Sequence, residues 1–197
     1  MQTFDNEKQE ILEILVQHCI PLETWGTGSY RSFEDFVRYA TEDQFFLRNG
    51  GNCGLVVEVH AAIVVVVYQC RKKWLELYED RQVSPGGTTL RRTDFNGIAE
   101  TLKRNETPRD GAMRCLAEEL NFSNPKLYRL SECLGIERRD PVRSEKWPGL
   151  QAQYNRHPFE CVIGRNLFRK NGYRECERDG REIFFGWRPR RQLLLPL

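Results

Sequence analysis

One segment of the chain, residues 107–121, has the sequence of an amphipathic helix whose start is fixed by its own residues. Thr107 suits the N-cap, Pro108 suits the first helical position, and Asp110 completes a pattern close to a capping box. Apolar residues recur at spacings of three and four, which gives the helix one face for packing. These residues are Met113, Leu116 and Leu120. A helix with one such face needs a sheet or another helix to cover it, so this segment constrains the fold around it.

The same helix carries charged residues away from its apolar face. Arg114 and Glu118 are i,i+4 neighbours, and Glu119 follows directly. On an ordinary surface helix such a run is a solvated ion pair worth about 0.3 to 0.5 kcal/mol. The other interpretation is that the carboxylates hold a divalent metal ion, which takes oxygen ligands. The sequence on both sides of the helix favours the second interpretation.

Segments typical of β-strands flank the helix. Upstream, residues 55–60, 63–70 and 73–78 are rich in branched and aromatic side chains, and the second segment holds four consecutive valines. Downstream, residues 127–136, 159–164 and 182–187 predict at least three more strands. We therefore expect an α/β fold in which a mixed sheet surrounds the helix.

The charged residues stand at the spacing of a known motif. Seven residues separate Glu106 from Arg114, and Cys115 and two further residues precede Glu118 and Glu119. This arrangement resembles the Nudix box, in which a glycine, five residues, Glu, seven residues, Arg-Glu, two residues, Glu-Glu, one residue and a glycine follow in order. The chain departs from the box at Cys115, where the family has the Glu of its Arg-Glu pair.

The glycine positions of the box are also changed. Gly97 lies nine residues before Glu106 instead of six, so the resemblance requires a three-residue insertion around residues 101–103. Asn121 replaces the closing glycine, and Asn105 stands where many family members carry a glycine. Because Asn is among the few non-glycine residues that readily adopt the left-handed conformation, both changes are compatible with the motif.

The resemblance implies a fold, an α/β/α sandwich with a mixed sheet, and a chemistry. The chemistry is the attack of water on the diphosphate linkage of a nucleoside diphosphate joined to another group, which makes the protein a diphosphatase or pyrophosphohydrolase. In that chemistry Glu118 and Glu119 hold Mg²⁺, or Mn²⁺ in its place, while Arg114 orients the carboxylates and Glu106 ties the loop to the helix.

Cys115 leaves a gap in this machinery, because a thiol is a poor replacement for a carboxylate on a hard cation. The family often draws a further Glu from the downstream region, and Glu145 and Glu160 are candidates by their order in the chain. One alternative is a catalytically inactive Nudix-fold module that binds a small-molecule nucleotide as a sensor or regulatory subunit. An unrelated α/β protein is the other.

The first 50 residues predict two helices in front of this domain. Residues 5–16 have apolar positions at helical spacing, and Ser32 suits the cap of a second helix that runs towards Phe46. The glycine-rich segment at residues 48–52 marks a boundary. We therefore expect an N-terminal helical extension at residues 1–50 and a Nudix-like domain at residues 51–197. The two helices suit either a cover for the sheet or the interface of a homodimer.

Aromatic residues downstream of the helix allow two interpretations. Trp147 lies in a turn-rich loop, residues 144–150, and can stack on a base, with Tyr154 or Trp187 as a second face. The alternative, which we favour, is that Trp147 packs in the core or anchors the loop.

Bulk composition bears on partners and location. The net charge of +2 gives no clear nucleic-acid signature, although the C-terminal third is basic and offers either phosphate contacts or solubility. No apolar run approaches the ~18 residues that span a bilayer, and the polar start is unlike a secretory signal. Seven cysteines without a Cys-x-x-Cys pair are typical of free thiols in a reducing compartment. We expect a cytoplasmic protein without a membrane partner, whose apolar end at residues 193–197 docks on protein.

Overall fold

The computed structural model describes residues 2–43, 45–51, 54–91, 97–133, 135–177 and 179–190, with side chains from residue 5 onwards. The predicted docking segment at residues 193–197 lies outside these ranges. The chain forms two compact units. The first comprises Met1–Ala61, Thr101–Glu106 and Glu137–Arg156, and the second comprises Ala62–Glu100, Thr107–Ile136 and His157–Leu197. The predicted division into a helical extension at residues 1–50 and a domain at residues 51–197 stays a prediction.

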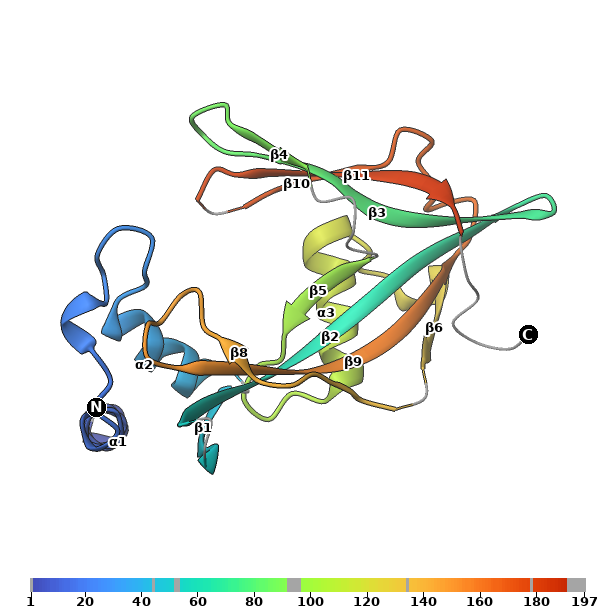
Figure 1. The fold of residues 1–197 in the computed structure, drawn as a ribbon. Coiled ribbons are helices and arrows are strands. Elements are labelled where there is room, and N and C mark those ends of the chain that lie inside the picture. The colour runs from blue at the N-terminus through green and yellow to red at the C-terminus, as the bar shows by residue number, and fades with distance from the viewer. Residues whose placement is uncertain are drawn as a thin grey trace. The chain divides into compact units, whose positions relative to one another are not determined.

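The first unit contains the two predicted N-terminal helices, α1 (Gln2–Gln17) and α2 (Phe33–Glu42), with a short 3-10 turn, η1 (Leu22–Thr24), between them (Figure 1). Ser32 caps α2 as predicted, since its hydroxyl accepts a hydrogen bond from the Asp35 backbone at 3.1 Å. The helix does not continue towards Phe46, and that prediction was wrong. Asp43 is extended, and strand β1 (Phe45–Asn49) follows, because Phe45 is buried whereas Phe46 is exposed, the alternation of a strand.

Aromatic side chains form the core of the first unit. Trp147 is only 6% exposed and makes edge contacts with Phe36 and Phe45, at centroid distances of 5.3 and 5.5 Å. Its indole N–H donates to the backbone oxygen of Ser32 at 3.4 Å. Trp147 is therefore a core residue that anchors its loop, as the favoured interpretation of the sequence held.

Two long strands, β2 (Leu55–Cys70) and β9 (Gln151–Ile163), contribute residues to both units. In the first unit, β1 pairs antiparallel with β2, and the short strands β7 (Glu137–Arg138) and β8 (Val142–Arg143) pair with β9. The sequence predicted two strands where β2 is one. The alanines at positions 61 and 62 have low strand propensity, but pairing in the sheet carries the strand through them.

The sheet of the second unit follows the order β10-β11-β3-β2-β9-β6, with β4 paired to β3 and β5 paired to β2. Its other strands are β3 (Lys73–Val83), β4 (Thr89–Arg91), β5 (Ile98–Thr101), β6 (Tyr128–Glu132), β10 (Tyr173–Cys176) and β11 (Glu182–Pro189). A 3-10 turn, η3 (Pro125–Leu127), precedes β6. All six predicted strand segments overlap observed strands. Strand β9 begins well before the predicted residue 159, and β10 was not predicted.

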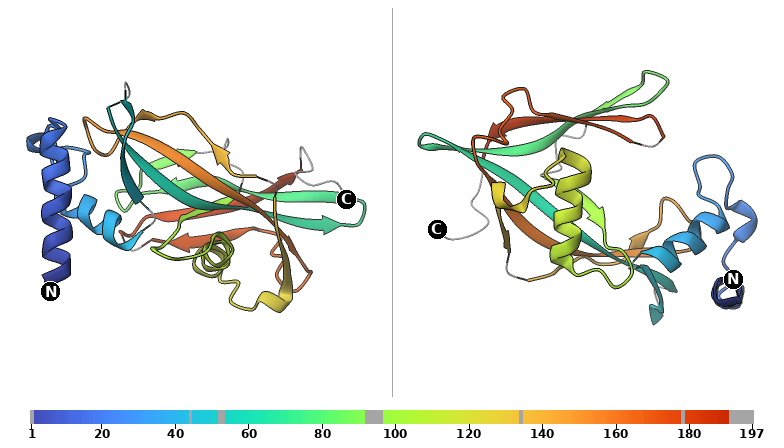
Figure 2. Two further views of the ribbon diagram at one scale, coloured as in Figure 1. Left: turned by 90° about the horizontal axis from the view of Figure 1, so that it is seen from below. Right: turned by 180° about the vertical axis from the view of Figure 1, so that it is seen from behind.

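Helix α3 (Pro108–Leu120) is the predicted central helix, and Figure 2 shows it beside the sheet of the second unit. The Thr107 hydroxyl accepts from the Asp110 backbone at 3.2 Å, and Asn121 ends the helix with a left-handed φ of 60°, both as expected. The buried positions are Gly111, Ala112, Cys115, Leu116 and Leu120. Met113 is only half-buried, so the packed face is rotated from the predicted one, which placed Met113 rather than Cys115 in the interface.

The predicted fold class is confirmed. The chain is an α/β protein with a mixed, curled sheet and few helices, and helical structure precedes the sheet. Among the described residues, none of the helices combines the length and apolar character needed to cross a membrane.

Gly97 allows the close approach of β5 to β2, and substitution there tests this packing. A Cβ atom at Gly97 would lie 2.4 Å from the backbone oxygen of Val64, and its φ is +100°. Gly87 has a similar φ of +81° but open space around it. We expect Gly87→Ala to lower the free energy of unfolding by about 1 kcal/mol, from backbone strain alone. Gly97→Ala should lower the free energy of unfolding, measured with urea, by at least ~2 kcal/mol more than Gly87→Ala does. Equal losses in the two variants would contradict the close approach.

Candidate functional site

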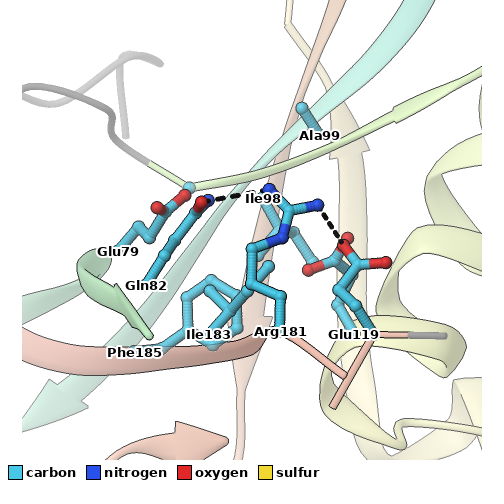
Figure 3. A pocket seen from close by; sticks show the side chains of 10 residues that line it. Glu79, Gln82, Ile98, Ala99, Glu119, Arg181, Ile183 and Phe185 are labelled. Atoms are coloured by element: carbon cyan, nitrogen blue, oxygen red, sulfur yellow. Dashed lines mark hydrogen bonds and ion pairs between the residues drawn. The ribbon is translucent and has the colours of Figure 1, made fainter. Parts of the chain in front are cut away.

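A cavity of about 300 Å³ lies in the second unit, open to solvent. Strands β3, β5 and β11, helix α3 and the hairpin between β10 and β11 contribute its lining. The side chains that line it include Glu79, Gln82, Ile98, Glu119, Glu177, Arg181, Ile183 and Phe185 (Figure 3). One wall is therefore apolar, whereas the remaining lining combines carboxylates with a guanidinium and an amide.

A β-bulge aims two polar side chains of β3 into this cavity. The register between β3 and β11 shifts between Phe184 and Phe185, which leaves Asp80 without an opposite residue. An extra residue reverses the alternation of side chains along the strand. Glu79 and Gln82 therefore face the same side although they are three residues apart, and both are largely buried.

Glu119 of α3 lines the cavity, and Glu175 of β10 lies next to it, outside the cavity lining. A hydrogen bond joins their two carboxyl groups, which requires a proton shared between them. Burial, this hydrogen bond and the charges of Glu100 and Glu177 hold the pKa of Glu119 well above its ordinary value. Burial also raises the pKa of Glu175. The pair therefore retains a proton at neutral pH because too much negative charge is gathered in one buried place.

Arg114 organises the carboxylates on the outer side of this pair. Its Nη1 donates to Glu118 Oε2 at 3.1 Å and lies 3.3 Å from Glu100 Oε1 on β5. Glu118 is 56% exposed and stands outside the cavity lining, although its charge contributes to the raised pKa of Glu175. Of the two predicted metal carboxylates, Glu119 thus lies in the cavity and Glu118 lies at its outer side.

Cys115 is fully buried beside these acids. Burial and the charges of Glu119 and Glu100 raise the pKa of the thiol well above its ordinary value. A neutral, buried thiol is neither a nucleophile nor a ligand for a hard cation. The residue that departs from the motif therefore packs α3 and supplies no chemistry of its own.

Glu106 closes the loop that precedes α3. Its Oε2 accepts from the Lys103 backbone N–H at 2.8 Å, and its own N–H donates to the Lys103 oxygen at 2.9 Å. Asn105, between them, has a φ of 65°, the left-handed conformation expected of it. The predicted tie between this loop and the helix stays a prediction, because the loop belongs to the first unit.

The downstream acids that lie near Glu119 are not the two that the sequence predicted, Glu145 and Glu160. Glu160 is buried on β9 and forms an ion pair with Arg190, whereas Glu145 is exposed in the first unit. Glu175 and Glu177, which no motif marks, supply the carboxylates near Glu119. Only the position of β10 beside α3 reveals them, and the sequence did not predict that strand.

Arg181 is a further residue of the site that the sequence did not reveal. It lies at the end of the hairpin between β10 and β11, and Figure 3 shows its guanidinium between Gln82 and Glu119. Its Nη1 donates to Gln82 Oε1 at 3.1 Å, and its Nη2 lies 3.6 Å from Glu177 Oε1. The basic character of the C-terminal third did not mark Arg181 in particular, because a lone arginine in a turn carries no pattern.

The donors around the cavity fit a hard divalent cation in part. Among the described residues, no three His, Cys, Asp or Glu side chains are arranged to hold a metal ion in the free protein. Mg²⁺ usually takes one or two carboxylates from a protein and completes its shell with waters and substrate phosphates. Glu119 and Glu175 provide such a pair, and a cation in place of their proton relieves their repulsion. The donor set therefore fits Mg²⁺ that binds together with a phosphate ligand.

No protein-family model and no curated protein sequence matches the chain. Solved structures show partial similarity. The E. coli dihydroneopterin triphosphate pyrophosphohydrolase aligns over 53% of this chain and 67% of its own, with 18% identity and a TM-score of 0.38. RenU, a Nudix hydrolase from M. smegmatis, aligns over 66% of this chain and 70% of its own, with 12% identity and a TM-score of 0.35.

A third similar structure is the NUDIX domain of Shewanella oneidensis NrtR complexed with ADP ribose. It aligns over 67% of this chain and 73% of its own, with 12% identity and a TM-score of 0.35. Similarity at this level carries no inference about activity, which rests instead on the residues described above.

The shared proton predicts an unusual effect of Glu119→Gln on stability. Because the pKa of Glu119 is raised from 4.5 to about 10, its contribution to stability is full below pH 4.5 and is lost as the pH rises towards 10. A glutamine amide replaces the protonated carboxyl without this loss. We expect Glu119→Gln to melt at least about 2 °C higher than the natural protein at pH 8.5, in the absence of metal, and to differ little at pH 4.5.

The matched control is Glu118→Gln, which changes an exposed acid one residue away. Its melting temperature should stay close to that of the natural protein at both pH values, apart from the loss of its ion pair with Arg114. A Glu119→Gln variant that is less stable than the natural protein at pH 8.5 would show that Glu119 is ionised and favourably paired in the free protein.

Proposed function

We propose that the protein is a Nudix-type, Mg²⁺-dependent diphosphatase that cleaves the diphosphate linkage of a nucleoside diphosphate-linked small molecule. The observation that carries this proposal is the carboxyl pair of Glu119 and Glu175, of which Glu119 lines an open cavity. Glu119 stands at the spacing of the Nudix box and is the box residue that projects into the cavity. A buried pair that holds a proton by mutual repulsion is poised to exchange that proton for a cation.

The residues around the pair have distinct roles in this proposal. Glu119 and Glu175 hold the cation, and Glu118, steered by Arg114, contributes a third carboxylate from the outer side. Bound there, Mg²⁺ neutralises phosphate charge and lowers the pKa of a bound water. Glu106 fixes the loop in front of the helix through its bond to Lys103. The resemblance to the Nudix box supports a nucleotide as the part of the substrate beyond the phosphates.

A second candidate function is a nucleotide-binding sensor or regulatory module with the same cavity. Cys115 favours it, since a buried neutral thiol replaces a carboxylate of the box. The two candidates share the ligand and differ in whether the bound diphosphate is cleaved. Turnover therefore separates them.

Release of phosphate monoesters or pyrophosphate from a panel of dinucleotides, nucleoside diphosphate sugars and nucleoside triphosphates tests the proposal. We expect Mg²⁺-dependent release from at least one class, with Mn²⁺ as a working substitute. Glu119→Gln should lower kcat/KM at least about a hundredfold, because it removes a carboxylate that holds the cation. Glu145→Gln changes an exposed acid of the first unit and serves as the control, with activity unchanged. Release that persists without a divalent cation would contradict the proposed chemistry.

Cys115→Glu separates the hydrolase from the binding module. In a hydrolase that lacks one carboxylate, this change should raise Mg²⁺-dependent turnover about tenfold or more, equivalent to ~1.4 kcal/mol of transition-state stabilisation. The added charge is buried, so we expect a lower melting temperature without metal than for the matched variant Cys115→Gln. Nucleotide binding with turnover at background, in both the natural protein and Cys115→Glu, would identify the binding module instead.

A further inference from the structure

The hairpin that joins β10 to β11 holds Arg181 in a fixed position. The Glu177 N–H donates to the Arg181 oxygen at 2.8 Å, and the Gly180 N–H donates to the Glu177 oxygen at 2.9 Å. The Arg181 N–H donates to Asp179 Oδ1 at 3.0 Å. These bonds fix the backbone of the turn, and Gln82 holds the Arg181 side chain in the cavity without a ligand.

The guanidinium of Arg181 is incompletely satisfied by the protein. Its Nη1 donates to Gln82, which the bulge in β3 aims at it. Its Nη2 lies 3.6 Å from Glu177 Oε1 and 3.7 Å from Asp179 Oδ2, beyond hydrogen-bond distance. Its Nε is buried and has no hydrogen-bond partner among the described residues. A buried N–H without an acceptor is costly, so such a group in a cavity calls for an explanation.

We propose that Arg181 binds a phosphate oxygen of the diphosphate ligand through its guanidinium, whose Nη2 lies beyond hydrogen-bond distance of both Glu177 and Asp179. The proposal rests on the function proposed above, because that function places a diphosphate next to Glu119. Arg181 and Glu119 both line the cavity (Figure 3), so the guanidinium and a cation held by Glu119 would share the same space. A diphosphate between them presents oxygens to both. The planar, permanently charged guanidinium is the side chain best suited to phosphate.

The acids near Arg181 fit this role in the free protein. Glu177 and Asp179 hold the guanidinium by charge at distances too long for good hydrogen bonds. Phosphate oxygens can therefore replace them without breaking strong bonds. Gln82 keeps its own bond to Nη1 throughout and positions the group.

Binding of inorganic pyrophosphate, measured by calorimetry in the presence of Mg²⁺, tests the proposal. We expect Arg181→Gln to weaken pyrophosphate binding at least about tenfold, and Arg181→Lys to recover part of the loss, since lysine restores the charge but lacks the planar set of donors. The matched control is Arg174→Gln, which removes an arginine of the same hairpin that pairs with Glu182 outside the cavity lining. This control should bind pyrophosphate as the natural protein does.

A second readout separates phosphate binding from a merely structural role. Mg²⁺ affinity without pyrophosphate should stay unchanged or increase in Arg181→Gln, because the change removes a nearby positive charge. A structural role predicts that Mg²⁺ and pyrophosphate binding weaken together, or that both Arg181 variants unfold, and either result overturns the inference. If Arg181→Gln binds pyrophosphate as tightly as the natural protein, this inference fails while the proposed function stands. If the natural protein binds no pyrophosphate with Mg²⁺, both fail.

Discussion

The interaction on which the site depends is the hydrogen bond between the carboxyl groups of Glu119 and Glu175. It brings together an acid from helix α3 and an acid from β10, which are 56 positions apart in the sequence (175 − 119). Two half-buried carboxyl groups joined in this way cannot both be ionised without a large electrostatic cost, so the free protein keeps a proton there. The same repulsion that binds the proton can bind a divalent cation. The stability and the proposed chemistry of the site thus come from one electrostatic constraint.

Local features of the chain place this pair. The Thr107 cap and the left-handed Asn121 fix where α3 begins and ends, and therefore which side chains face the sheet. Cys115 and Leu116 are buried against the sheet, which leaves Glu119 one turn further along at the edge of the packed face. On the opposite wall, the bulge at Asp80 turns Gln82 into the cavity, where it holds Arg181. Helix caps and a single extra strand residue thus determine the geometry of the site.

The sequence predicted the parts of the fold that depend on neighbouring residues. The caps at Ser32 and Thr107 and the left-handed Asn105 and Asn121 follow from local chemistry, and the structure confirms each. The α/β class with a mixed sheet follows from hydrophobic patterns and is also confirmed. The helix expected to reach Phe46 was wrong, because pairing with β2 makes that segment a strand. The metal-binding roles of Glu118 and Glu119 and the division at residue 50 stay predictions.

The components of the site that the sequence did not reveal come from tertiary contacts. Glu175 lies on a strand that hydrophobic pattern alone did not predict, and Arg181 lies in a turn without a motif. Gln82 faces the cavity only because a bulge reverses the alternation of β3, and no sequence rule located that bulge. The packed face of α3 includes Cys115 rather than Met113, a rotation too small to predict from residue spacing. Each of these depends on how distant segments pair.

The measurement that tests the central claim most directly is the number of protons released when Mg²⁺ binds. Calorimetric titration with Mg²⁺ and pyrophosphate, in two buffers of different ionisation enthalpy at pH 8, gives this number from the difference in heat. Mg²⁺ titrated into pyrophosphate without the protein gives the correction for protons that the ligand itself releases when it binds the cation. If Glu119 and Glu175 hold the cation in place of their shared proton, the protein releases about one proton, and Glu119→Gln releases none. A natural protein that binds Mg²⁺ with no proton release, or with the same release as Glu119→Gln, contradicts the account.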